Sequence, residues 1–322
     1  YLLYNFQKTM SCSFSFLRLW NYLNIYFLKP FDAVNDTITS DLLLKLNWRK
    51  NYIEIGSGDG MFSYIMHGNS FPIWFDRYLN VNLNSKNIFK TKSKAHLKFP
   101  KFIKRDFKIA PKLSIDARPH HIEFIKKIKF SKAAKYSKYE NLNISKNSQD
   151  LIFFYTPHGL KSYGVAFKKA VKCLRKNGKL LVLLFLDNVN ENFVFYRLKR
   201  NSKGKLKKFF TKMDNGRYSE TFKISKKYNL WVKLFKKNNL MILNSYTGLR
   251  PMAWKIYDIQ TRPILNYLIK FFSIFPIFFR TLLKLCWMII LYPLICLVYI
   301  VCSNIKKSKN NKNCYVAFEL KK

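Results

Sequence analysis

The stretch Tyr52-Ile-Glu-Ile-Gly-Ser-Gly-Asp-Gly60 decides how the rest of the chain is interpreted. Its first part, Tyr52 to Ile55, predicts a short buried strand, and Gly56, Gly58 and Gly60 predict a tight turn. The apolar residues that follow recur at helical spacing, so we expect a helix to start directly after the turn. A strand, a glycine turn and a helix N-terminus form a cradle in which free backbone N–H groups point at a bound molecule.

Two positions beside the turn narrow the kind of ligand. A dinucleotide-binding turn has a further glycine at the position that Met61 occupies here, for close packing near a pyrophosphate. Glu54, two residues before the first glycine, places a carboxylate where an ammonium group can sit. The turn therefore departs from the dinucleotide pattern.

Composition bounds the fold and the partners. A chain of 322 residues, 49% of them hydrophobic, suits one domain with insertions or one domain with an accessory segment. The formal net charge of +42 suggests nucleic acid or an anionic membrane surface as a partner. The lysines are spread along the chain together with many asparagines, however, so a solvated basic surface is the alternative. The six cysteines form no C-x-x-C pair, which gives little support to a metal site or a disulfide framework.

Two segments are candidates for the second strand, and each ends in a carboxylate. Residues 112–116 end in Asp116 and are followed by Pro119 and by isoleucines at helical spacing. Residues 71–76 end in Asp76, which lies at the customary distance from the glycine turn. A carboxylate at a strand end can accept hydrogen bonds from both hydroxyls of a ribose. We favour Asp116 for its local context and keep Asp76 as the alternative.

Three later segments extend the pattern. Residues 140–155 end in a buried strand, with Asn143, Ser148 and Asp150 ahead of its apolar part. A helix over residues 167–174 and a turn at Gly178 lead into residues 179–185, a fully buried strand. Strands are also expected over residues 240–246 and 314–320.

In this order, these segments resemble motifs of the class I S-adenosylmethionine-dependent methyltransferases. The glycine turn matches E/D-x-G-x-G-x-G, and residues 142–150 match L-P-x-x-x-x-S-x-D with Asn143 in place of the proline. The resemblance covers roughly residues 35 to 250. It implies an α/β, Rossmann-like sheet of seven strands, whose seventh strand pairs antiparallel beside the sixth. A short stretch from Trp254 to Pro263 is similar to a type 11-like bacterial group found among envelope genes.

The resemblance also implies a cofactor and its site. S-adenosylmethionine is the expected cofactor, and the residues expected to bind it are Glu54, Gly56, Gly58, Gly60, Asp116 or Asp76, and Tyr155. His158, just past the fourth strand, is a candidate base for an oxygen acceptor, and a structural histidine is the alternative.

The last sixty residues change character. Residues 285–303 contain no charge, which is about the length that spans a bilayer, and basic residues flank them on both sides. A final strand that rejoins the sheet requires both ends of this segment on one side of the membrane. Pro293 divides the run into two short arms, so a kinked, re-entrant or interfacial segment is favoured over one full crossing.

The predicted organisation has four parts. A lead-in helical segment covers residues 1–34, the methyltransferase domain 35–262, a membrane-associated hydrophobic segment 263–312, and the final strand 313–322. Insertions are expected at about 77–112 and 189–222.

The predicted function is methyl transfer from S-adenosylmethionine at the cytoplasmic membrane face, to a lipid, a lipid-linked glycan or another small envelope metabolite. The expected partners are that substrate and an anionic membrane surface, and no metal is expected. Nucleic acid is disfavoured, because the region after the fourth strand lacks an N-P-P-Y-type motif and the chain has no Pro-Cys nucleophile. The alternatives are an RNA methyltransferase, supported by basicity alone, and a non-catalytic membrane-tethered binding module.

Overall fold

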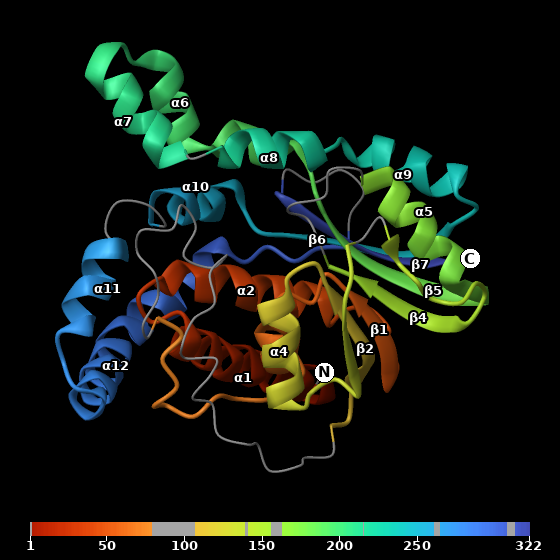
Figure 1. The fold of residues 1–322 in the computed structure, drawn as a ribbon, viewed down its shortest axis with the longest axis horizontal. Helices are drawn as coiled ribbons and strands as arrows, with labels where there is room; N and C mark the ends of the chain where they lie inside the picture. The colour runs from red at the N-terminus through yellow and green to blue at the C-terminus, as the bar shows by residue number, and fades with distance from the viewer. Residues whose placement is uncertain are drawn as a thin grey trace.

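A single mixed sheet organises the chain. The structure is a computed structural model that describes residues 2–78, 107–138, 141–155, 163–214, 216–260, 265–307 and 313–322. Within these residues the strands lie in the order β3-β2-β1-β4-β5-β7-β6 (Figure 1). The strands are β1 (Asn51–Ile55), β2 (Ala110–Asp116), β3 (Ala133–Tyr136), β4 (Gln149–Phe154), β5 (Leu174–Phe185), β6 (Met241–Gly248) and β7 (Tyr315–Lys321).

Strand direction confirms the predicted fold class. Strands β1 to β5 pair in parallel, whereas β7 lies antiparallel between β5 and β6. This is the seven-stranded arrangement that the resemblance to the class I methyltransferases implies. Residues 71–76, the alternative second strand, form turns instead, and β2 includes residues 110–112 of the expected insertion.

Helices cover both faces of the sheet (Figure 1). Alternate side chains of β5 enter two different cores, as the period of two requires. Leu181 and Leu183 face the core shared with α1 (Leu2–Ile25), α2 (Pro30–Leu43) and α3 (Met61–Met66). Leu180 and Val182 face the core shared with α5 (Tyr163–Cys173) and α9 (Tyr228–Lys237).

The remaining helices lie around these layers. Helix α4 (Pro119–Ile128) follows β2, and the 3-10 helix η3 (Asp187–Asn192) follows β5. The expected insertion at 189–222 is largely helical, and the helix α2 runs across the predicted boundary at residue 35. The others are α6 (Val194–Asn201), α7 (Gly204–Asp214), α8 (Arg217–Ile224), α10 (Pro251–Gln260), α11 (Leu265–Ser273) and α12 (Ile277–Cys302).

Residues 285–302 of the uncharged run lie within one continuous helix, α12. Helix α12 contains Pro293, which therefore does not split the segment into the two short arms that a re-entrant form needs. Among the described residues, α12 is the one helix long enough and apolar enough to cross a membrane. It packs against α1 and α2, and β7 rejoins the sheet after it, as the final strand was expected to do.

A buried carboxylate ties β7 to its neighbours. Glu319 has no exposed side-chain surface and accepts hydrogen bonds from Lys179 Nζ (2.6 Å), Asn244 Nδ2 (2.9 Å) and Asn47 Nδ2 (2.9 Å). Burial alone would raise the pKa of Glu319, but these hydrogen bonds hold it below its usual value. The carboxylate therefore joins β5, β6, β7 and the segment ahead of β1.

Removing this carboxylate should destabilise the sheet. Glu319→Ala leaves the Lys179 ammonium and two amides without their acceptor, so the free energy of unfolding should fall by about 3 kcal/mol. Unfolding by denaturant measures this free energy. Asp150→Ala is the control, because its pair with Arg175 is half exposed and should contribute less than about 0.5 kcal/mol. Equal losses in the two variants would contradict a central role for Glu319.

Candidate functional site

The glycine turn has the predicted form. It joins β1 to α3, and its glycines adopt positive φ angles of 83° at Gly56, 58° at Gly58 and 79° at Gly60. A Cβ at Gly60 would lie 3.0 Å from Ile125 Cγ1, so this glycine lets α4 pack against the turn. A Cβ at Gly58 would meet nothing within 4 Å. The turn therefore combines one closely packed glycine with one that borders open space.

Glu54 lies directly beneath the turn. It is 1% exposed, and its Oε1 accepts a hydrogen bond from the Ser63 hydroxyl. Its Oε2 is buried and has no hydrogen-bond partner among the described residues. Burial raises the pKa of Glu54 to about 8. A positively charged ligand group beside this carboxylate would satisfy the oxygen and lower the pKa again.

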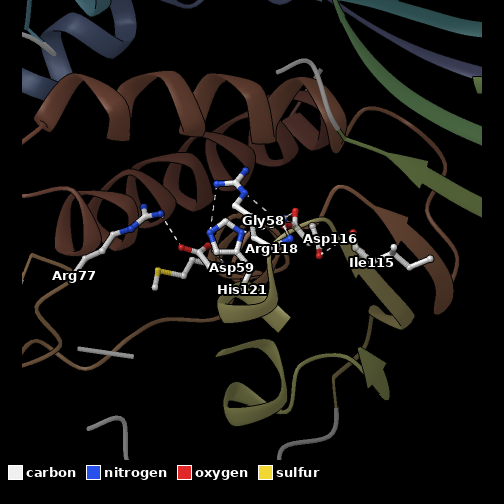
Figure 2. A network of polar contacts seen from close by, with 9 residues as sticks. Gly58, Asp59, Arg77, Ile115, Asp116, Arg118 and His121 are labelled. Atoms are coloured by element: carbon white, nitrogen blue, oxygen red, sulfur yellow. Dashed lines mark hydrogen bonds and ion pairs between the residues drawn. The ribbon is translucent and has the colours of Figure 1, made fainter. Parts of the chain in front are cut away.

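Asp116 reaches the turn from the end of β2. Its Oδ2 accepts a hydrogen bond from the Gly58 N–H (3.0 Å), and its Oδ1 accepts one from the Arg118 N–H (3.0 Å). His121 Nδ1 lies 3.2 Å from Oδ1 (Figure 2). The structure thus brings Asp116 to the glycine turn, as the favoured interpretation of the sequence expects.

Asp76 points elsewhere. Its carboxylate accepts hydrogen bonds from the Tyr78 N–H (2.8 Å) and from Arg280 in α12 (Nε, 3.1 Å). The next residue, Arg77, donates to Asp59 Oδ2 of the glycine turn (2.7 Å; Figure 2). Asp76 therefore fastens α12 to the domain, and only its neighbour in the chain contacts the turn.

Tyr155 lies beside the turn at the end of β4. Its N–H donates to the Ile55 carbonyl oxygen (2.9 Å), and its ring stacks on Phe62 with centroids 4.6 Å apart. Glycine turn, Asp116 and Tyr155 thus follow three adjacent parallel strands, at the sheet edge where ligands bind in folds of this type. His158 lies outside the described residues.

One acidic residue of this region was missed by sequence analysis. Asp36 lies within α2, where burial first and the nearby Asp32 second raise its pKa to about 7, against a hydrogen bond with Tyr26. The Arg77 guanidinium lies over the Tyr26 ring at 4.8 Å and joins this group to the glycine turn. The available signal was a pair of carboxylates, Asp32 and Asp36, four residues apart in α2, a spacing that places both on one face.

No model of a protein family matches the chain, and no curated protein sequence matches it. Among solved structures, it is similar to a SAM-dependent methyltransferase from Thermotoga maritima, described as a possible histamine N-methyltransferase. The two chains share 12% identity at a TM-score of 0.47, with 89% of each covered.

Two further structures show the range of activities among similar folds. Phosphoethanolamine N-methyltransferase 2 of Haemonchus contortus, solved with S-adenosyl-L-methionine, shares 12% identity at a TM-score of 0.42. The match covers 88% of this chain and 52% of that one. The [4+2]-cyclase SpnF shares 12% identity at a TM-score of 0.43, with 90% and 80% covered. At these values the likeness concerns the arrangement of the chain alone.

The raised pKa of Glu54 makes a prediction about stability. A folded-state pKa of about 8, against a usual value of 4.5, means that the folded state binds this proton more tightly than the unfolded state. The contribution of Glu54 to the free energy of unfolding therefore falls as the pH rises from 4.5 to 8. Glu54→Gln should remove this dependence, so thermal unfolding without ligand should show a variant more stable than the natural chain at pH 8. The difference should vanish towards pH 4.5. A variant less stable at pH 8 would contradict the assignment.

Proposed function

We propose that the chain is an S-adenosylmethionine-dependent methyltransferase. The observation that carries this proposal is the buried, unpartnered Oε2 of Glu54 beneath a glycine turn that borders open space at Gly58. A cofactor with an ammonium group fits the carboxylate, and a ribose fits Asp116 at the next strand end. The sequence motifs support the same cofactor, and the similar structures include a SAM-dependent methyltransferase and an enzyme solved with S-adenosyl-L-methionine.

Each residue at the sheet edge has a proposed task. Glu54 holds the amino group, Gly56, Gly58 and Gly60 let the backbone approach closely, and Asp116 accepts hydrogen bonds from the ribose hydroxyls. When bound, the cofactor supplies an electrophilic methyl group. Tyr155 packs beside it and limits access of water.

The acceptor is proposed to be a small polar molecule or a lipid-linked metabolite. Asp36, with a pKa near neutrality, is the described group best suited to take a proton from it, and His158 remains the candidate from the sequence. We place the reaction at the cytoplasmic face of a membrane. The apolar helix α12, which is joined to the glycine turn through residues 76 and 77, supports a location at a membrane.

Cofactor binding is the direct test. Gly58→Val places a branched side chain in the open space before the turn, at a φ of 58° that valine rarely adopts. Calorimetry with S-adenosylmethionine should show binding to the natural chain and none to a variant whose circular dichroism spectrum is unchanged. Gly204→Val, also at positive φ with nothing within 4 Å but in α7, is the matched control and should bind normally. Binding unchanged in folded Gly58→Val would refute the cofactor assignment.

The ribose assignment has a test of its own. Asp116→Ala should weaken cofactor binding roughly thirtyfold, about 2 kcal/mol, because charge-assisted hydrogen bonds are lost. Asp76→Ala should leave the affinity of the folded protein within about twofold, since its carboxylate faces Arg280. Affinities from the same calorimetric titration decide between them. The reverse ranking would assign the ribose to Asp76.

A further inference from the structure

Helix α12 buries its charged side chains and exposes apolar ones, the reverse of a helix on the surface of a water-soluble domain. Its buried positions include its two charged residues, Arg280 and Lys284. Its large exposed side chains are all apolar and each is at least 50% exposed: Ile277, Phe278, Phe279, Leu282, Ile289, Ile290, Leu294, Leu297, Ile300 and Val301. We call these ten side chains the outer face. In the most apolar stretch of the helix, 17% of residues are buried, so α12 is not a core helix.

The charged residues are held by the domain. Arg280 pairs with Asp76, and Lys284 Nζ donates to the carbonyl oxygens of Ile73 (3.0 Å) and Phe75 (2.7 Å). Both cations at the N-terminal end of α12 are thus turned away from the outer face. A helix that crossed a bilayer near this end would have to break these contacts.

The rest of the helix is fastened in the same way. Trp287 Nε1 donates to the Phe27 carbonyl oxygen (2.8 Å), and the Tyr292 hydroxyl donates to the Phe16 carbonyl oxygen (2.9 Å). The Tyr299 hydroxyl donates to a carboxylate oxygen of α2. Polar contacts to the domain therefore recur along almost the whole helix. Figure 1 shows α11 and α12 at the side of the molecule, beside α1 and α2.

The positive charge of the chain indicates the kind of surface that the outer face can contact. Exposed lysines precede and follow α12 in the sequence, Lys270 on α11 and Lys306 and Lys307 after α12, in a chain of net charge +42. The segment that leads into α12 adds Phe271 and Ile274, which are 52% and 76% exposed. An apolar helix face with exposed lysines before and after it in a basic chain matches a bilayer with anionic headgroups. A second copy of the chain would carry the same positive charge, which opposes association of two copies.

We propose that the outer face is a membrane-docking surface, and that α12 lies in the plane of an anionic bilayer with its inner side on the domain. The helix enters one leaflet and does not cross the bilayer. This inference adds to the proposed function the surface, its lipid class and its orientation. It stands on the packing of α12 and does not depend on methyl transfer.

Vesicle binding tests the surface. The purified chain should float with vesicles of phosphatidylcholine and phosphatidylglycerol, and bind pure phosphatidylcholine at least about tenfold more weakly. Leu297→Glu should weaken binding to the anionic vesicles by about tenfold or more. Leu206→Glu on α7 is the matched control, because Leu206 and Leu297 are 61% and 62% exposed, and it should bind normally.

Depth measurements test the orientation. Phe279→Cys, Ile290→Cys and Ile300→Cys, each with Cys286→Ser, are coupled to a fluorescent dye, since Cys286 is exposed. Brominated lipids should quench the three dyes at one common shallow depth. A deep signal at position 290 with shallow signals at 279 and 300 would mean a crossing helix and would overturn the proposal.

The alternative partner for the outer face is a second copy of the chain. Light scattering without lipid should give a mass that Leu297→Glu does not change. A dimer that Leu297→Glu dissociates, together with no flotation, would assign the outer face to self-association instead. Gly58→Val should lose cofactor binding and still bind vesicles, because the glycine turn is not part of the outer face. Failure of one proposal would therefore be distinguishable from failure of the other.

Discussion

The position of β7 is the constraint on which the rest of the structure depends. This strand follows the other six described strands in sequence, yet it lies antiparallel between β5 and β6, so among the described strands β6 pairs with β7 alone. The Glu319 carboxylate fixes that position by binding groups from three neighbouring segments. Because β7 must pair between β5 and β6, both ends of α12 are held beside the same domain. The pairing of β7 thus keeps this apolar helix of 26 residues against the domain.

Residues 76 and 77 also hold α12 beside the domain. Their side chains contact different partners: Asp76 binds Arg280 on α12, and Arg77 binds Asp59 in the glycine turn. Both ion pairs are largely buried, where the interaction between charges is strong and a missing partner is costly. Two adjacent residues therefore connect the hydrophobic helix with the candidate cofactor site.

Patterns within a few residues of the sequence were enough to predict the glycine turn and several strands. The glycine turn, the strand ending at Asp116 and the strand over residues 179–185 follow from spacing and apolar runs within a few residues. Asp76 was ambiguous because its partner, Arg280, lies about two hundred residues away in the chain. The raised pKa of Asp36 could not be predicted for the same reason, since it arises from the packing of α2 against other elements. Pro293 suggested two arms because sequence cannot show that α12 is supported along its length by α1 and α2.

Apart from Asp116, the acids on and near the glycine turn fall into two groups. Asp32, Asp59 and Asp76 each form an ion pair with a nearby lysine or arginine. Glu54 and Asp36 form no ion pair among the described residues, and burial raises the pKa of each towards or above neutrality. In a chain with 59 basic residues, a scarcity of cations does not explain this difference. Unpaired buried carboxylates lower stability, and such groups persist mainly where a ligand or a reaction requires them. The lack of an ion pair therefore distinguishes Glu54 and Asp36 as the acids that we assign to the amino group of the cofactor and to the acceptor. Asp116, which lies beside Arg118 and His121, is assigned to the ribose on its position at the glycine turn instead.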